Sequence, residues 1–194
     1  DCNRNGASRW KAAVKAAYFG YKVAIIEKDS AYGGAGVKTG TVPSKTLKET
    51  ALYLSGKYYS GLYGIERKLQ EKASVKHFLY RKNLIVKSIS EEVHHNLEIH
   101  KVDIYHGSAS FIDEHHLEIK GAEPVVIKGE YIIIATGSYP YHPPGIPFDG
   151  NYIYDSDTIL EIDRMPETIC IVGAGVIGCE YATIFQLLAV KSIL

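Results

Sequence analysis

Few cysteines, no net charge and no long apolar run are the first features of this 194-residue sequence. Its three cysteines, Cys2, Cys170 and Cys179, match neither a disulfide framework nor the spacing of a metal site, so we expect no metal. The 22 basic residues balance the 22 acidic ones, which argues against nucleic acid or a membrane surface as a partner. No apolar stretch reaches the length of a bilayer-spanning helix, and the first residues lack the apolar core of a signal peptide. These absences together predict a cytoplasmic protein.

A strand, a glycine-rich turn and a helix follow one another near the end of the sequence. The apolar residues 169–172 lead into Gly173, Gly175 and Gly178, which are spaced as G-x-G-x-x-G, and a helical pattern follows. In dinucleotide-binding folds the first glycine allows a tight turn, the second lets backbone N–H groups approach a pyrophosphate, and the third lets the helix pack on the strand. Free N–H groups at the helix start favour an anion there. The motif predicts a dinucleotide site, and the alternative is a glycine-rich turn of some other α/β protein.

Hydrophobic periodicity predicts an α/β fold for the whole chain. Helices are expected over residues 12–18, 43–56, 73–97 and 155–160. Buried strands are expected at 22–28, 131–137, 169–172 and 190–194, and a small antiparallel meander over 102–131. Loops are expected at 33–36 and 57–64. Cys170 and Cys179 are expected to be small buried hydrophobic residues.

Four segments resemble the FAD-dependent pyridine nucleotide–disulfide oxidoreductases. They are residues 40–47 (GTVPSKTL), 135–143 (ATGSYPYHP), 154–157 (YDSD) and 173–182 (GAGVIGCEYA). Within that family the chain looks most like the soluble pyridine nucleotide transhydrogenases. The resemblance implies a Rossmann-like FAD-binding domain with a small antiparallel meander over residues 1–150, followed by the start of a second Rossmann-like, NAD(P)-binding domain over 151–194.

Both ends of the sequence depart from a complete protein of that family. The family's first strand and first glycine fingerprint should precede Ala12, but of its three glycines only Gly6 is present. Arg9 takes the place of the third glycine, where it would hold the helix and the strand apart. Our hypothesis is that residues 1–10 are a frameshifted or otherwise corrupted end, and the alternative is a genuine end that weakens FAD binding. We expect the chain to be a fragment that stops inside the NAD(P)-binding domain.

The resemblance also implies individual roles. Glu27, at the end of the second strand, would accept hydrogen bonds from the adenosine ribose of FAD, since a carboxylate can hold two hydroxyl groups. Lys45 would lie near the reactive edge of the flavin and pair with Glu180, while Ser44 would approach the FAD phosphate or the flavin. The alternatives without a functional role are a surface acid for Glu27 and a solvated helix residue for Lys45.

Lys45 and Glu180 are therefore the candidate catalytic residues. The residues expected to contact FAD or NAD(P) are Gly6, Glu27, Lys28, Gly34, Thr41, Ser44, Lys45, Ala135, Thr136, Gly137, Gly173, Gly175, Val176, Ile177 and Gly178. The expected substrates are NAD(H) and NADP(H), and the parent protein is expected to be a homo-oligomer.

The redox disulfide of the family has no counterpart in this sequence. Gly36 and Thr41 stand at the two cysteine positions that precede Pro43-Ser44-Lys45, and neither can form a thiolate or a mixed disulfide. The expected activity is therefore hydride transfer between NADPH and NAD+ through FAD alone, with the isolated chain inactive. One alternative is a diverged dihydrolipoamide dehydrogenase-like reductase or NAD(P)H oxidase. The other is an inactive dinucleotide-binding fragment.

Overall fold

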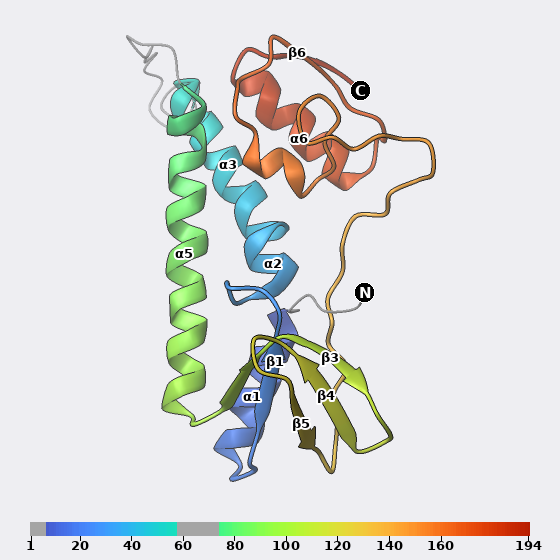
Figure 1. Cartoon of the computed structure of the whole chain (residues 1–194). Helices are drawn as coiled ribbons and strands as arrows, with labels where there is room; N and C mark the ends of the chain where they lie inside the picture. The colour runs from blue at the N-terminus through green and yellow to red at the C-terminus, as the bar shows by residue number, and fades with distance from the viewer. Residues whose placement is uncertain (1–6, 58–73) are drawn as a thin grey trace. The chain divides into compact units, whose positions relative to one another are not determined.

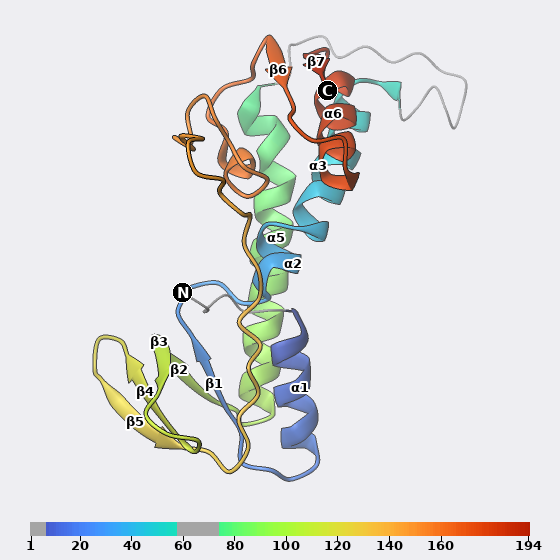
Figure 2. The same cartoon turned by 90° about the vertical axis from the view of Figure 1, so that its right-hand side faces the viewer.

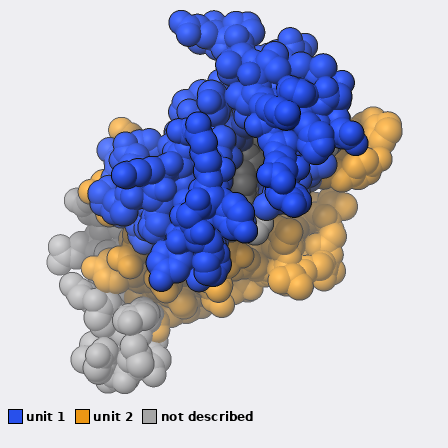
Figure 3. All heavy atoms as spheres, turned by 90° about the horizontal axis from the view of Figure 1, so that it is seen from below, with its two compact units in different colours: residues 1–38, 87–139 blue, residues 39–86, 140–194 orange. Residues whose placement is uncertain are grey.

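Residues 7–57 and 74–194 are described by the computed structural model, whose helices and strands are shown in Figures 1 and 2. Contacts divide the chain into two compact units, each built from two stretches of sequence (Figure 3). Unit 1 combines residues 1–38 with 87–139, and unit 2 combines residues 39–86 with 140–194. The predicted division at residue 150 concerns cofactor binding, and it stays a prediction.

Unit 1 contains a two-stranded parallel sheet with helices beside it. Strand β1 (Ala24–Glu27) pairs with β2 (Asp103–His106), and Ile25 lies opposite Ile104. Helix α1 (Ala7–Tyr18), the second half of α5 (Val75–Ile99) and two residues of the connecting segments supply the rest of its core. The buried residues of this core are Ala13, Ile25, Tyr32, Val93, Leu97 and Val102. The helix predicted over 12–18, the strand predicted at 22–28 and the long helix predicted over 73–97 are confirmed.

The first run of the predicted meander belongs to this parallel sheet instead, so that part of the prediction is wrong. The remaining runs form an antiparallel sheet in the order β3 (Ser108–Phe111), β4 (His116–Lys120), β5 (Val125–Lys128), as predicted. β2 is reached from β1 through α5, and such a long crossover is what a parallel pair requires. Alternation of apolar residues shows that a run is a strand, but it does not identify the strand's partner.

Asp113 closes the turn between β3 and β4. One of its carboxylate oxygens accepts hydrogen bonds from the backbone N–H groups of His115 and His116, each at 2.8 Å. The N–H of His115, followed by the side chain of His116, lowers the pKa of Asp113 to about 2. The turn is therefore held by a carboxylate that stays ionised.

Two further predictions in unit 1 are wrong. Residues 131–137 form no strand and are largely exposed, with Ile133 at 72% exposure and Ile134 at 70%. A buried parallel strand needs neighbouring strands and covering helices, and the parallel sheet described in this unit has β1 and β2 alone. The expected loop at 33–36 is partly helical, because α2 spans Gly34–Lys38. Gly33 permits that start with a φ of 108°.

Unit 2 is built around α3 and α6. Helix α3 (Thr41–Leu54) and α6 (Val176–Leu187) pack together with the first half of α5 and the short 3-10 helix η1 (Thr158–Glu161). The buried residues of this core are Leu47, Ala51, Phe78, Leu79, Ile159, Leu160, Ile162, Tyr181, Ile184, Phe185 and Val190. These elements confirm the helix predicted over 43–56, which begins two residues earlier, and the short helix predicted near 155–160.

Two short strands complete unit 2. β6 (Thr168–Cys170) pairs in parallel with β7 (Lys191–Ile193), which confirms the strands predicted at 169–172 and 190–194. The expected burial of the two cysteines is wrong, because Cys170 and Cys179 are both exposed. Cys179 lies on the face of α6 opposite the one that enters the core, and one apolar side chain in a helix does not reveal which face is buried. Within residues 7–57 and 74–194, no helix is both long and apolar enough to cross a bilayer.

Ile184→Ala is expected to lower the free energy of unfolding by about 2–5 kcal/mol, because the fully buried side chain leaves a cavity. Ile133→Ala removes the same atoms from an exposed position, so we expect a change below about 0.5 kcal/mol. Urea unfolding followed by circular dichroism measures both variants. An equal loss in the two would show that residues 131–137 are buried.

Candidate functional site

The glycine-rich turn of unit 2 joins β6 to α6. Gly173 adopts a φ of 114°, a value that side chains rarely allow, and Gly175 is the residue that caps the start of α6. A Cβ atom at Gly178 would lie 1.9 Å from the carbonyl oxygen of Gly173, so no larger residue fits there. A Cβ atom at Gly175 would meet nothing within 4 Å. The turn therefore brings Gly178 close to the Gly173 carbonyl and leaves open space at Gly175.

The start of α6 is accessible from outside. Val176 is 87% exposed and Ile177 is 57% exposed, and both belong to the first turn of α6. The first backbone N–H groups of a helix have no acceptor within the helix itself. The open space at Gly175 and these N–H groups together form a place where an anion can approach the backbone.

A groove of about 540 Å³ lies between α3 and α6, within unit 2. It is lined by Thr41, Ser44, Lys45 and Lys48 from α3 and by Val176, Cys179, Glu180 and Thr183 from α6. Each set follows the i, i+3, i+4, i+7 spacing of one helix face. The structure thus brings both candidate catalytic residues, Lys45 and Glu180, to one groove, together with the predicted contact residues Thr41, Ser44 and Val176.

Sequence reasoning did not single out Lys48 or Thr183, and it named Cys179 only as a buried residue. The signal was present, because each lies one helical turn from a residue that was singled out. What the sequence did not reveal is that these two faces would lie opposite each other. That follows from the burial of Leu47 on α3 and Ile184 on α6 in one core.

The charged groups of the groove are not locked together. Lys45 is exposed and Glu180 is half-buried. Among the contacts of residues 7–57 and 74–194, no direct ion pair joins them, although both line the groove. Burial raises the pKa of the neighbouring Tyr181, and the negative charge of Glu180 adds to that effect. The Tyr181 hydroxyl donates a hydrogen bond to the carbonyl of Ser156 at 3.1 Å, which ties α6 to the segment before η1.

Ser44 lies in the first turns of α3 rather than at its cap. Helix α3 begins at Thr41, with Gly40 as its N-cap, and the Ser44 backbone N–H donates to the Gly40 carbonyl at 3.2 Å. The Ser44 side chain is buried, and its hydroxyl donates to the Thr41 carbonyl at 3.5 Å. Ser44 therefore lines the groove with its hydroxyl bonded to the backbone of its own helix.

Glu27 occupies the end of β1 in unit 1 and is 1% exposed. Its Oε1 accepts a hydrogen bond from the backbone N–H of Asp29 at 3.0 Å, and Asp29 forms an ion pair with Lys38. Burial, followed by the charges of Glu27 and Glu98, raises the pKa of Tyr32. The carboxylate of Glu27 is therefore held in place at the carboxyl end of a parallel strand, where ligands bind in folds of this type.

The remaining predicted residues of unit 1 lie in loops or at helix starts. Lys28 is exposed, and Gly34 is buried at the start of α2. Ala135 and Thr136 are half-buried, and Gly137 is exposed with a φ of 78°. Gly6 lies outside the described residues.

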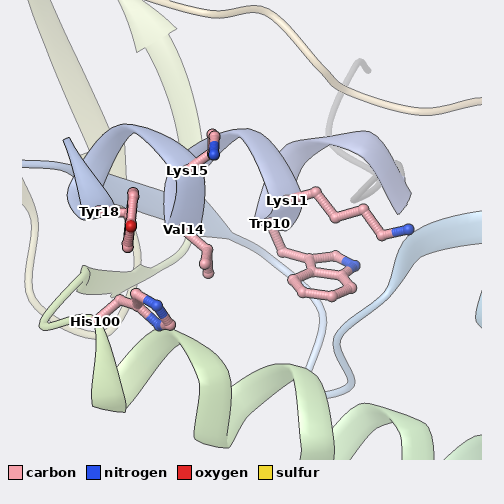
Figure 4. A pocket seen from close by; sticks show the side chains of 6 residues that line it. All are labelled: Trp10, Lys11, Val14, Lys15, Tyr18 and His100. Atoms are coloured by element: carbon pink, nitrogen blue, oxygen red, sulfur yellow. The ribbon is translucent and has the colours of Figure 1, made fainter.

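Unit 1 also has a smaller groove of about 260 Å³ between α1 and the end of α5 (Figure 4). Its walls are Trp10, Lys11, Val14, Lys15, Tyr18 and His100. Trp10 and Val14 point from α1 toward α5, and His100 lies at the far end of the groove near Tyr18. None of the residues predicted to bind a cofactor lines it. In the part of the chain that the structure describes, no three His, Cys, Asp or Glu residues are grouped to hold a metal ion.

A family model described as pyridine nucleotide-disulphide oxidoreductase matches residues 5–194. The soluble pyridine nucleotide transhydrogenase of Mycobacterium bovis (strain BCG / Pasteur 1173P2) is 38% identical over 190 residues, covering 96% of this chain and 41% of that protein. The protein of the same name from Hahella chejuensis is 36% identical over 198 residues, covering 93% of this chain and 39% of that protein. The chain thus spans about two fifths of the length of the curated relatives it matches.

Solved structures show the same fold. The HOCl-induced flavoprotein disulfide reductase RclA of Escherichia coli aligns with a TM-score of 0.79 and 31% identity, over 96% of this chain and 39% of that one. LpdA of Mycobacterium tuberculosis aligns with a TM-score of 0.86 over 98% of this chain and 42% of that one. Its 23% identity supports the Rossmann-like fold alone.

Gly178→Ala is expected to destabilise the protein by about 1–3 kcal/mol, because its Cβ would overlap the Gly173 carbonyl oxygen. Gly175→Ala places its Cβ in open space at a φ of −78°, so we expect the free energy of unfolding to change by less than about 0.5 kcal/mol. Denaturant unfolding of the two variants beside the unaltered chain measures both effects. A Gly178→Ala variant as stable as the unaltered chain would contradict the close approach.

Proposed function

This chain belongs to the pyridine nucleotide-disulphide oxidoreductase family, and on that premise we propose that it is part of a flavoprotein that transfers hydride between NADPH and NAD+ through FAD. The observation that carries the proposal is the groove between α3 and α6, which brings Lys45 and Glu180 together. FAD, when bound, supplies a ring that takes hydride from one nicotinamide and gives it to the other.

The work of Lys45 and Glu180 is electrostatic. An ammonium group near the flavin favours the negative charge of the reduced ring, and a nearby carboxylate keeps that ammonium group protonated and oriented. Lys45 lies on the groove face of α3, and Glu180 faces the same space from α6. We propose that Lys45 is directed at the flavin and that Glu180 orients it.

The glycine turn fits a dinucleotide. The pyrophosphate of NAD(P) would lie against the open space at Gly175 and accept hydrogen bonds from the first N–H groups of α6, with Val176 and Ile177 beside it. Gly178 contributes indirectly, because its missing Cβ lets α6 begin close to β6. For FAD, the carboxylate of Glu27 would accept hydrogen bonds from the adenosine ribose. Lys28, Gly34 and residues 135–137 would complete that site from the same unit.

The residues at positions 36 and 41 support flavin-only transfer over dithiol chemistry. A disulfide reductase of the family needs two thiols before Pro43-Ser44-Lys45, but Gly36 and Thr41 carry none. Cys179 lines the groove but has no second thiol among the lining residues. We therefore propose that no redox disulfide takes part in the transfer.

The finer expectations complete the proposal. Residues 1–150 would belong to the FAD-binding domain and 151–194 to the NAD(P)-binding domain. NAD(H) and NADP(H) are the proposed substrates, the cytoplasm the proposed compartment and a homo-oligomer the proposed assembly of the parent protein.

FAD is expected to bind the purified parent protein, since the isolated chain is expected to be inactive, and to show the absorption bands of a protein-bound flavin. NADPH is expected to bleach those bands, and a thionicotinamide analogue of NAD+ is expected to restore them, because the flavin passes on the hydride it receives. Anaerobic absorption spectroscopy follows both steps. A parent protein that remains colourless with excess FAD would contradict the proposal, and bleaching reversed by oxygen alone would favour an NAD(P)H oxidase.

Two substitutions distinguish the proposed NAD(P) site from the proposed FAD site. Gly175→Ala is expected to weaken NADPH binding about tenfold or more while leaving FAD binding unchanged, because its methyl group would occupy the phosphate approach. Glu27→Gln keeps the acceptor for the Asp29 N–H but loses the charge. We therefore expect it to weaken FAD binding and to leave NADPH binding unchanged. Equilibrium titrations with each nucleotide measure the two affinities. Equal losses of both ligands in either variant would show a general effect on folding.

A further inference from the structure

Lys48 is a second lysine of the α3–α6 groove for which the proposed function has no role. Leu47 and Ala51, on the face of α3 beside the groove, are 1% and 0% exposed in the core of unit 2. Their burial fixes the rotation of α3 about its axis. Lys48 is therefore held on the groove face, one helical turn beyond Lys45.

The charged groups that line the groove are two ammonium groups and one carboxylate. Lys45 and Lys48 extend from α3, and Glu180 is the only acidic residue among the lining residues of this groove. Nearby Glu49 lies within 3.9 Å of Arg81 and is not among the lining residues. The two lysines therefore share a single carboxylate across the groove.

Neither lysine is locked onto Glu180. The ion pairs formed by residues 7–57 and 74–194 include none between Glu180 and either lysine, and both lysines are exposed. Long side chains that pair at an exposed site gain at most about 1 kcal/mol, so such pairs exchange readily. A carboxylate has acceptor positions for both ammonium groups, but closer pairing with one weakens its hold on the other.

We propose that Lys48 is a positioning residue that competes with Lys45 for the Glu180 carboxylate. This inference rests on the proposed function, in which Lys45 is directed at the flavin. When Lys45 leaves Glu180, Lys48 supplies the opposite charge, so the carboxylate is not left alone in a groove that a ligand covers. Lys48 thereby allows Lys45 to move away without leaving the Glu180 carboxylate unpaired.

Carbodiimide cross-linking of the chain without cofactor tests the competition directly. The reagent joins an amine to a neighbouring carboxylate as an amide, and peptide mass spectrometry identifies the joined residues. We expect both Lys45–Glu180 and Lys48–Glu180 products. The Lys87–Glu91 pair on α5, at 3.8 Å, gives an internal reference for reaction yield.

Three variants separate competition from a structural effect. Lys48→Gln is expected to raise the Lys45–Glu180 yield about twofold, since two partners of similar strength no longer share one carboxylate. Lys48→Arg keeps the charge and, like Lys48→Gln, has no reactive amine, so the two variants differ in charge and the Lys45–Glu180 yield should rise less in Lys48→Arg than in Lys48→Gln. Lys76→Gln removes an exposed lysine of α5 outside the groove, leaves the Lys87–Glu91 reference in place and should leave every Glu180 product unchanged.

The absence of a Lys48–Glu180 product would overturn the proposal, and so would a Lys45–Glu180 yield that is the same in Lys48→Gln as in the unaltered chain. A rise in Lys48→Arg equal to that in Lys48→Gln would also overturn it, because charge would then be irrelevant. FAD binding by the parent protein tests the proposed function separately. A parent protein that binds no FAD contradicts the proposed function, while the competition measured without cofactor is decided by the cross-linking yields alone.

Discussion

The packing of α3 against α6 is the constraint on which the candidate site depends. Leu47 and Ala51 from one helix share a core with Ile184 and Phe185 from the other, and Phe78 of α5 contacts Phe185 with ring centroids 6.2 Å apart. Burying these residues leaves another stripe of each helix along one groove. The apolar core therefore decides which polar residues meet, although none of its members takes part in the proposed chemistry.

The backbone and the charged side chains near that groove differ in how firmly they are held. The backbone of the glycine turn is tightly packed, since a Cβ at Gly178 would lie 1.9 Å from a carbonyl oxygen. The charged side chains are loose by comparison, with Lys45 exposed and joined to no described carboxylate. A rigid backbone suits a phosphate that must be held at fixed donors, whereas long side chains suit a group whose charge changes during a reaction. The two nucleotide sites of the proposed function thus use different physical means.

Local sequence patterns predicted most of the elements. The helices over 12–18, 43–56 and 73–97 and the three strands of the antiparallel sheet follow from periodicity and turn residues near each segment. The errors have a common cause. Residues 131–137 read as a buried strand because they are apolar, and the run at 102–105 read as part of a meander because it alternates. Burial and strand pairing both depend on partners that are distant in the sequence.

The amino-acid sequence by itself determined the family, the glycine fingerprint, the identity of Lys45 and Glu180 as candidates and the absence of thiols at positions 36 and 41. These properties reside in residue types and short spacings, which the chain carries before it folds. Only the tertiary structure decided that Lys48, Cys179 and Thr183 share the groove with them, and that both cysteines of unit 2 are exposed. The physical reason is that a helix shows its amphipathic pattern locally, but the neighbour that covers its apolar face is chosen by packing between segments far apart in the chain.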